Sequence, residues 1–498
     1  MLMRRETVIL VKIKTDLAVV AAGPAGLAAA IAAAEQGVKV CVFEKANNVG
    51  GAANMGMGPF GVESDLQKRT FGSLTKEDAF RRFMDYEHWT VDGNLVHNYI
   101  WRSGDTINWL EEMGVKFAAA AKYFPDSEAT WHLVQPENGP PGPRAAGTMT
   151  RIMANHAKEL GAEIYLQTPV TRLLKNDDRI TGLVAIDSEG NEIEVCAKAV
   201  VVATGGFGDN EEMIKEYCGY TFGKDMFNNR IPGLKGDGMK MAWAVGAKKS
   251  KTEMELMLDS GMPIMTHMGA FLFRQPSILV VNKQGERIMN EELIQNSSVS
   301  ANIVERQKDK TAYAIVSDKI VKYYSRYGLD YPTMVAFGDP TENFDSELER
   351  AREQYPDCAF RADSLEELAQ QIGIEPEVLL ETVERYNEQC DQNYDDDMCK
   401  SRRYLRPIAG KKFYAERVAL GAYGSLGGIA VNAKLEVVDN NERPIPGLYG
   451  AGSDVCNIYN GTYMFYFPGS TMGFALNSGR MAGENAAEYI QESDELDG

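Results

Sequence analysis

Glycines, one acid and a late run of tyrosines are the residues of this sequence whose types and spacing suggest chemistry. Gly23 and Gly26 follow the apolar run Leu17 to Val20, and Glu44 comes eighteen positions after Gly26. Glycines at this spacing open a helix whose first N–H groups can bind a pyrophosphate, and the acid can accept hydrogen bonds from a ribose. Because a carboxylate there repels a further phosphate, these residues favour FAD or NAD over NADP.

Further glycines distinguish FAD from NAD as the cofactor. Gly50 and Gly51 lie just beyond the acid and Lys45, where they let the backbone approach a second part of a long dinucleotide. Ala203 to Gly206 repeats the signal as the end of a buried strand followed by a Thr-Gly-Gly turn. Ala21 departs from the G-x-G-x-x-G pattern, because its methyl group must fit a tight turn. The alternative is an ordinary βαβ unit that binds no cofactor. It does not account for the spacing of the strand, the glycine turn, the helix, the second strand and the acid, so we favour FAD.

A buried parallel sheet is needed to hold these residues. Leu17 to Val20 and Val38 to Phe43 are short apolar runs without alternation, as strands covered on both faces should be. Leu27 to Gln36 is predicted to form an alanine-rich helix that ends at Gly37. A long helix is expected from Ser470 to Ala487, with partial positive charge at its N-terminus.

Length and composition limit the class of protein. The 498 residues exceed what one hydrophobic core usually supports, and 44% of them are hydrophobic, as in a soluble globular protein. With 52 basic and 71 acidic residues the net charge is −19, a poor basis for binding nucleic acid or anionic lipid. No stretch approaches the roughly 20 apolar residues of a membrane span, and no cleavage site follows the basic N-terminus.

The seven cysteines are scattered and include no C-x-x-C pair. This spacing argues against an iron–sulfur or structural zinc site, and the five histidines show no metal-ligand spacing either. We therefore expect no metal. An odd number of scattered cysteines fits a reducing compartment, so we expect a cytoplasmic protein.

Three stretches of the chain differ in their motifs and in their predicted secondary structure. Residues 1–234 carry both dinucleotide signals, whereas residues 235–405 mix extended segments with helices. A polar, acidic stretch from Asp391 to Asp397 reads as a return linker, and residues 406–498 regain strand and turn signals. A chain that revisits the dinucleotide so late is predicted to build one α/β FAD-binding domain from separated segments.

Four motifs together carry a family resemblance. They are AAGPAG with the acid Glu44, ATGGFG from Ala203 to Gly208, VNKQGERIMNEE from Val281 to Glu292, and the closing GLYGAG…PGSTMGFALNSGR. Their order and spacing resemble the flavoprotein family of fumarate reductases, succinate dehydrogenases and 3-ketosteroid dehydrogenases. The resemblance implies a Rossmann-like FAD-binding domain interrupted by a smaller α+β capping domain at residues 235–405. Substrate would lie between the cap and the isoalloxazine ring.

The same resemblance implies an activity and a cofactor site. The family exchanges a hydride between flavin N5 and a C=C bond activated by a neighbouring carbonyl or carboxylate. Helix N–H groups at the start of the last helix would lie near flavin O2 and N1. The residues implied around non-covalent FAD are Gly23, Ala25, Gly26, Glu44, Lys45, Gly50, Gly51, Asn54, Met55, Val170, Ala203, Thr204, Gly205, Gly206, Gly452, Ser453, Asp454, Ser470, Thr471 and Met472.

Departures from the family pattern point to the substrate. Gln295 stands four residues after Glu291, where fumarate-reducing members have a proton-donating arginine and ketosteroid dehydrogenases a tyrosine. Tyr459 replaces the histidine of fumarate reductases, and Tyr463 to Phe467 fills the region of their carboxylate-binding arginine. Because a dicarboxylate needs fixed positive partners, the sequence predicts a bulky apolar or aromatic enone or enoate rather than fumarate.

The catalytic candidates are Tyr459, Tyr463, Tyr466 and Gln295. Since Gln295 cannot supply a proton at neutral pH, a tyrosine is the expected donor, and Tyr459 is the first choice. Core packing behind the flavin is the alternative role for each aromatic residue. Two rival functions remain, an FAD oxidase or dehydrogenase of another bond type and an electron-transfer subunit without alkene chemistry. No haem motif or covalent flavin segment is evident, so we expect a separate electron donor or acceptor; the oligomeric state stays open.

Overall fold

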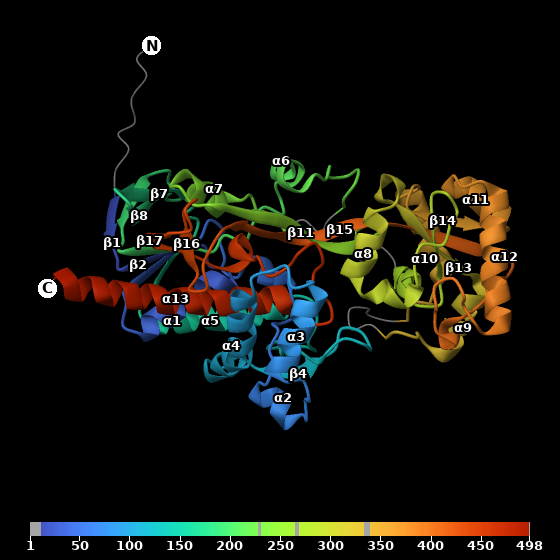
Figure 1. The fold of residues 1–498 in the computed structure, drawn as a ribbon, viewed down its shortest axis with the longest axis horizontal. Coiled ribbons are helices and arrows are strands. Elements are labelled where there is room, and N and C mark those ends of the chain that lie inside the picture. The colour runs from blue at the N-terminus through green and yellow to red at the C-terminus, as the bar shows by residue number, and fades with distance from the viewer. Residues whose placement is uncertain (1–10, 228–230, 264–267, 333–338, 498) are drawn as a thin grey trace, which may run out of the picture.

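Two lobes joined by a pair of long strands make up the mixed α/β fold, as Figure 1 shows. The computed structural model describes residues 11–227, 231–263, 268–332 and 339–497. Both ends of the described chain belong to the larger lobe, where the N-terminal strands and the last helix lie (Figure 1). None of the helices in these ranges combines the length and the apolar character that crossing a bilayer requires.

The larger lobe is organised by a six-stranded sheet. Its order is β16, β17, β10, β2, β3, β6, and all neighbours are parallel except β16 and β17. Every residue of β2, β3 and β10 is buried, as expected for strands covered on both faces. The bounds are β2 Leu17–Val20, β3 Val40–Phe43, β6 Glu163–Tyr165, β10 Ala199–Val202, β16 Glu436–Val438 and β17 Pro444–Gly450.

Two helices pack closely beneath this sheet. Seven of the twelve residues of helix α1 (Pro24–Glu35) are alanine, and α13 (Ser470–Asp497) meets it through glycines. A Cβ atom at Gly479 would lie 2.1 Å from the backbone oxygen of Ala25, and one at Gly483 would lie 2.3 Å from that of Ala29. Only small side chains allow this approach. Helix α1 begins three residues earlier than predicted, because Pro24 is suited to a first helical position.

A second sheet and several helices complete the larger lobe. The sheet has the order β1, β9, β8, β7, with β1 Val11–Lys14, β7 Val170–Asn176, β8 Arg179–Ile186 and β9 Glu192–Cys196. Helix α7 (Asp237–Ala244) contacts β7. The other elements are α2 Asp65–Arg69, α3 Lys76–Tyr86, α4 Gly93–Glu112, α5 Ala146–Glu159, α6 Glu211–Met213 and the hairpin of β4 Phe117–Ala121 and β5 Trp131–Val134.

The strands β11 (Lys249–Asp259) and β15 (Phe413–Ile429) pair antiparallel and run from the larger lobe into the smaller one (Figure 1). There β15 also pairs with β13 and β14, and β13 pairs with β12. The smaller lobe contains β12 Leu279–Asn282, β13 Ala312–Ser317, β14 Ala359–Ala362, α8 Ser297–Glu305, α9 Asp318–Tyr327, α10 Phe344–Gln354, α11 Leu365–Ile372 and α12 Pro376–Gln392.

The stretch after α12 is not the loose linker that its acidity predicts. Asp395 is buried and accepts a hydrogen bond from Arg287 at 2.8 Å. Arg287 also binds Glu291, and the fully buried Lys400 lies 3.1 Å from the same carboxylate. Burying charges is costly unless they are paired, and these four groups satisfy one another. Glu291, four residues before Gln295, therefore sits inside a structural ion cluster.

Candidate functional site

The glycine loop after β2 leaves the start of α1 open. Ala21 has a φ of +81°, a conformation that costs an L-residue roughly 1–2 kcal/mol. A Cβ atom at Gly26 would lie 1.9 Å from the backbone oxygen of Ala21, whereas one at Gly23 would meet no atom within 4 Å. No side chain caps the first turn of α1, and that turn contains no acid. Its N–H groups are thus available to an anionic ligand.

Glu44 links the glycine loop to the end of β3. One carboxylate oxygen accepts the N–H of Ala22 at 2.8 Å, and the other accepts that of Ala46 at 2.7 Å. The side chain is buried, and a carboxylate has about four acceptor positions, so acceptors remain for ribose hydroxyls. The backbone oxygen of Glu44 binds the N–H of Thr168, which brings the start of β7 at Val170 alongside. Lys45 instead pairs with Asp237 at 2.6 Å.

The loop from Gly50 to Met55 returns to the same place. Gly50, at a φ of +106°, donates its N–H to the oxygen of Ala22 at 2.8 Å. A Cβ atom at Gly51 would lie 3.5 Å from the Cα atom of Gly23. The side-chain amide of Asn54 donates a hydrogen bond to the backbone oxygen of Val49 at 2.8 Å. Met55 is 54% exposed, a large apolar side chain left uncovered in this loop.

Asp454 holds the Thr-Gly-Gly turn after β10. Its buried carboxylate accepts the hydroxyl of Thr204 at 2.9 Å and the N–H of Gly206 at 2.8 Å. Burial raises the pKa of Asp454, although these hydrogen bonds oppose the shift. Gly205 and Gly206 both have a φ of +83°, which favours glycine. The predicted Gly452-Ser453-Asp454 segment therefore shapes the Ala203–Gly206 turn.

The start of α13 is surrounded by hydroxyl groups and one acid. Ser470 Oγ lies 2.7 Å from the hydroxyl of Tyr459, and the N–H of Thr471 donates to the hydroxyl of Tyr463 at 3.3 Å. Thr471 Oγ1 donates to a carboxylate oxygen of Glu255 at 2.8 Å. A Cβ atom at Gly56 would lie 2.5 Å from the Cε methyl of Met472, so this helix start meets the Gly50–Met57 loop.

These segments fit FAD. The space beside Gly23, the uncapped start of α1 and the spare acceptors of Glu44 match a pyrophosphate and a ribose. The uncovered Met55 and the partly exposed Thr471 and Met472 offer an apolar and polar lining for a flat ring. Tertiary structure thus brings together the glycine loop, the Gly50 loop, the Thr-Gly-Gly turn and the start of α13.

The predicted catalytic residues lie in different surroundings. The rings of Tyr459 and Tyr463 are 5.2 Å apart and both side chains are buried. Tyr466 packs instead against Tyr86 and Phe124, with ring centroids 5.7 Å and 5.5 Å away. Gln295 donates to the backbone oxygen of Arg274 at 3.4 Å. Burial raises the pKa of Tyr459 and of Tyr463, so both phenols stay protonated near neutral pH.

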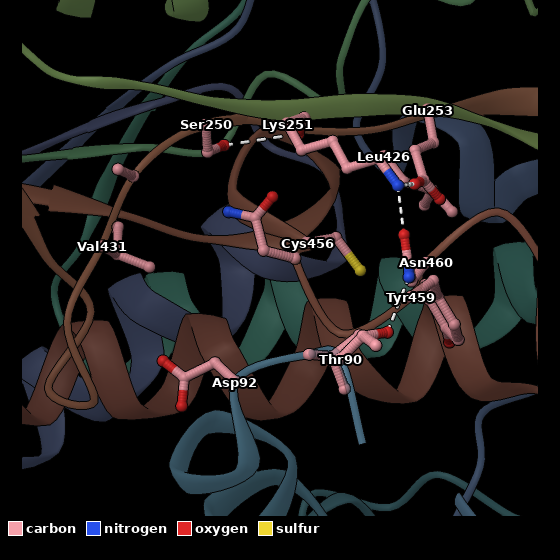
Figure 2. Close-up of a pocket in the computed structure, with 13 residues that line it drawn as sticks. Thr90, Asp92, Ser250, Lys251, Glu253, Leu426, Val431, Cys456, Tyr459 and Asn460 are labelled. Atoms are coloured by element: carbon pink, nitrogen blue, oxygen red, sulfur yellow. Dashed lines mark hydrogen bonds and ion pairs between the residues drawn. The ribbon is translucent and has the colours of Figure 1, made fainter. Parts of the chain in front are cut away.

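A pocket of about 310 Å³ adjoins Tyr459. Figure 2 shows it between the strands β11 and β15 and the helix α13, with Thr90 and Asp92 entering from the α3–α4 connection. Lys251 binds both Glu253 and the side-chain oxygen of Asn460, and Asn460 donates to Thr90 at 2.6 Å. Tyr459 therefore contacts the helix start through its hydroxyl while its side chain borders this polar pocket.

Two functional candidates were missed by the sequence reasoning. Glu255 is buried within β11, and burial raises its pKa to about 7 although Thr471 opposes the shift. Tyr423 lies in β15 and is 37% exposed. Neither residue belongs to a motif, and an acid or a tyrosine in a strand is usually read as a solvent-facing position. The only signal was an acid between apolar residues in EMELML.

Comparison with known proteins agrees with this geometry. A family model described as an FAD binding domain matches residues 16–465. The vinyl phenol reductase of Lactiplantibacillus plantarum is 28% identical over 489 residues, covering 96% of this chain and 97% of that protein. The NADH:fumarate oxidoreductase of Klebsiella pneumoniae is 27% identical over 95% of this chain, which spans only about half, 48%, of that relative.

Solved structures show the same fold. A 3-ketosteroid-Δ4-(5α)-dehydrogenase from Rhodococcus jostii, solved with 4-androstene-3,17-dione, superposes with a TM-score of 0.74. The superposition covers 97% of this chain and 98% of that chain at 22% identity. The resemblance to fumarate reductases and ketosteroid dehydrogenases that the motifs indicated is therefore confirmed.

Proposed function

The chain belongs to the FAD-binding domain family, and on that premise we propose that it is an FAD-dependent oxidoreductase of carbonyl-conjugated C=C bonds. Its proposed substrate is a bulky, uncharged aromatic or apolar enone, which it reduces or forms. The vinyl phenol reductase that aligns end to end with this chain supports an aromatic substrate. FAD, when bound, supplies hydride exchange at its N5 atom.

One observation carries the proposed substrate class. The side chains that hydrogen-bond to Ser470 and Thr471 belong to Tyr99, Tyr459, Tyr463 and Glu255. None of these four is a cation, and the acid would repel a carboxylate whenever it is ionised. A dicarboxylate needs arginine or histidine partners, whereas phenols and phenyl rings suit a neutral aromatic ligand.

The cofactor is proposed to bind non-covalently, through the twenty residues that the motifs indicate. The N–H groups at the start of α1 would receive the pyrophosphate, and Glu44 the ribose. The Gly50–Met55 loop, the Ala203–Gly206 turn with Asp454 and the Ser470–Met472 helix start would hold the rest. Two observations support this assignment: the segments lie close together in the fold, and no atom lies within 4 Å of a Cβ placed at Gly23.

The domain division is proposed as residues 1–234 and 406–498 for FAD binding, with a cap at 235–405. The strands β11 and β15 would connect the two parts, and substrate would lie between cap and cofactor. The proposed catalytic groups are Tyr459, Tyr463 and Tyr466, with Gln295 as a polar contact. A tyrosine hydroxyl would orient the carbonyl and deliver a proton to carbon, and a separate electron donor would restore the cofactor.

A substrate panel tests this function. The purified FAD-loaded protein is reduced with viologen dye, and flavin reoxidation is followed with benzylideneacetone, 4-vinylphenol, cinnamate and fumarate. We expect benzylideneacetone, the neutral aromatic enone, to reoxidise the flavin fastest and fumarate to fail; 4-vinylphenol, which has no carbonyl, shows whether an aromatic ring alone suffices. Equal or faster reoxidation by fumarate would contradict the proposed substrate class. Reoxidation by none of the alkenes would favour an electron-transfer subunit or an oxidase of another bond.

A further inference from the structure

A β-bulge joins an acid and a phenol at the centre of the site. Met254 of β11 pairs with Ser425 of β15, but Leu256 pairs with Ala422. One residue, Glu255, therefore opposes two, Tyr423 and Gly424. Opposed residues of an antiparallel pair direct their side chains to the same face, and a bulge re-aims them locally. Glu255 and Tyr423 consequently share one face of the β11–β15 ribbon.

The ribbon runs next to two of the proposed cofactor segments. Ser425, two residues after Tyr423, accepts the N–H of Phe207 at 2.7 Å, and a Cβ atom at Gly206 would lie 2.3 Å from its hydroxyl. Ser425 pairs with Met254 and so faces away from Glu255 and Tyr423, but a Cβ atom at Gly208 would lie 2.9 Å from the Cα atom of Gly424, the residue after Tyr423. The segment that follows the Thr-Gly-Gly turn therefore approaches the ribbon next to Tyr423. Glu255 reaches the other segment, through its 2.8 Å hydrogen bond from Thr471 at the start of α13.

Tyr423 differs from the three predicted tyrosines. Its hydroxyl forms no hydrogen bond with any residue in the described ranges, and 37% of its surface is accessible. By contrast, the hydroxyls of Tyr459 and Tyr463 are engaged by Ser470 and Thr471, and both side chains are at most 7% exposed. Although part of its side chain is accessible, surrounding protein removes water from the phenol, and this desolvation, with Tyr123 and Glu255 as the next contributors, raises the pKa of Tyr423 well above its ordinary value. The phenol therefore keeps its proton until a strongly basic group meets it.

Glu255 can restore that proton. It is 6% exposed and makes no ion pair within the described part of the chain. The titratable groups near it are Tyr423 from β15, Tyr463 before α13, Cys456 after the 3₁₀ turn at Gly452–Val455, and Glu253 on its own strand. Each of these groups is neutral when protonated and anionic when deprotonated, so none of them is a cation that would stabilise the Glu255 carboxylate. With its pKa raised by burial to about 7, Glu255 can both hold and release a proton at neutral pH.

We propose that Tyr423 donates the proton to the substrate carbon and that Glu255 reprotonates Tyr423, directly or through one water. This inference rests on the proposed function. In the reduction, the substrate receives a hydride with both electrons from the reduced cofactor at one alkene carbon. The other carbon forms a C–H bond as the O–H bond of Tyr423 breaks. The phenolate then takes the carboxyl proton of Glu255, which is replaced from solvent.

Single-turnover reoxidation tests the pair, with the faster of benzylideneacetone and 4-vinylphenol as the probe. We expect Tyr423→Phe to slow flavin reoxidation by about 10²- to 10⁴-fold, the usual range for losing general acid catalysis. In multiple turnover, the wild-type rate should fall as pH rises through about 7, because Glu255 must be protonated to restore the proton of Tyr423 between turnovers. Glu255→Gln should be slower and lose this pH dependence, and Glu255→Asp should regain it. Tyr313→Phe, on strand β13 of the smaller lobe, is the matched control.

A second measurement removes the dependence on turnover. In D₂O, the wild type should catalyse deuterium exchange at the methylene carbon beside the carbonyl of benzylacetone, the saturated product, without net redox change. Tyr423→Phe should abolish this exchange while FAD content and melting temperature stay within the range of the control. If Tyr423→Phe keeps wild-type rates in both assays, or if Glu255→Gln keeps the pH dependence, the pair is refuted. Failure of the wild type with every alkene would instead refute the proposed function.

Discussion

Replacing Glu44 by glutamine should lower both the stability of the apoprotein and its affinity for FAD, and the two effects can be measured separately. In the structure, each carboxylate oxygen accepts one backbone N–H, from Ala22 at 2.8 Å and from Ala46 at 2.7 Å. The amide of Glu44→Gln keeps one acceptor oxygen but turns an NH₂ group toward the second N–H. A hydrogen bond to a charged group contributes about 1.5–3 kcal/mol. The apoprotein should therefore lose about 1.5–3 kcal/mol of unfolding free energy even without FAD.

The second effect is on the cofactor. If a ribose hydroxyl also binds this carboxylate, Glu44→Gln should weaken FAD binding by a further 1–3 kcal/mol, which is about 5- to 150-fold in Kd. Glu44→Arg removes both acceptors and should bind FAD more weakly still. Urea unfolding of the apoprotein measures the first effect, and titration of apoprotein with FAD by fluorescence measures the second.

A matched control separates these effects from the loss of one charge. Glu159 ends α5 with 76% of its side chain exposed, so Glu159→Gln should change stability by less than about 0.5 kcal/mol. If the Glu44→Gln apoprotein unfolds at the same urea concentration as Glu159→Gln, the two backbone hydrogen bonds do not stabilise the fold. If the FAD affinity is also unchanged, Glu44 is not the ribose ligand, and the reasoning from the βαβ unit fails.

Other predictions concern the cofactor, the helix contact, one histidine and one tyrosine. Heating the holoprotein should release all flavin to the supernatant as FAD; flavin that stays with the precipitate would mean a covalent bond. Gly479→Leu should lower the melting temperature by several degrees or abolish folding, because even a Cβ atom would lie 2.1 Å from the backbone oxygen of Ala25. Burial lowers the pKa of His132 to about 4, so its contribution to stability is complete above pH 6.5 and is lost as pH falls toward 4. From pH 7 to pH 5 the wild type should lose about 2 kcal/mol relative to His132→Asn in urea unfolding; an unchanged difference would contradict this. Tyr459→Phe should retain FAD and slow single-turnover reoxidation by much less than Tyr423→Phe, because Tyr423 is the proposed proton donor; a loss of about 10²- to 10⁴-fold would make Tyr459 the donor and contradict that assignment.

Local patterns in the sequence determined much of the cofactor half. The strand Leu17–Val20, the helix after the glycines and the last helix from Ser470 were all predicted and are confirmed by the structure. Buried parallel strands read as uninterrupted apolar runs, and glycines mark the turns between them, so neighbouring residues suffice for these predictions. The spacing of Gly26 and Glu44 likewise lies within one βαβ unit.

Other features depended on contacts between distant segments. The acidic stretch at Asp391–Asp397 read as a linker, yet Asp395 is buried because Arg287, more than a hundred positions earlier, requires a counter-charge. Asp454 was expected to contact the cofactor, and only the fold showed that its carboxylate accepts the backbone N–H groups of Thr204 and Gly206.

The proposed proton donor shows most clearly what the sequence alone could not identify. The sequence and its family resemblance indicated that the arginine and histidine of fumarate reductases are replaced here, and the proposed charge class of the substrate follows from that. The sequence did not identify Glu255 or Tyr423, because their proximity arises from a one-residue shift in the pairing of β11 with β15. A carboxyl acquires an altered pKa only when tertiary packing removes it from water, as the contact with Thr471 at the start of α13 does for Glu255.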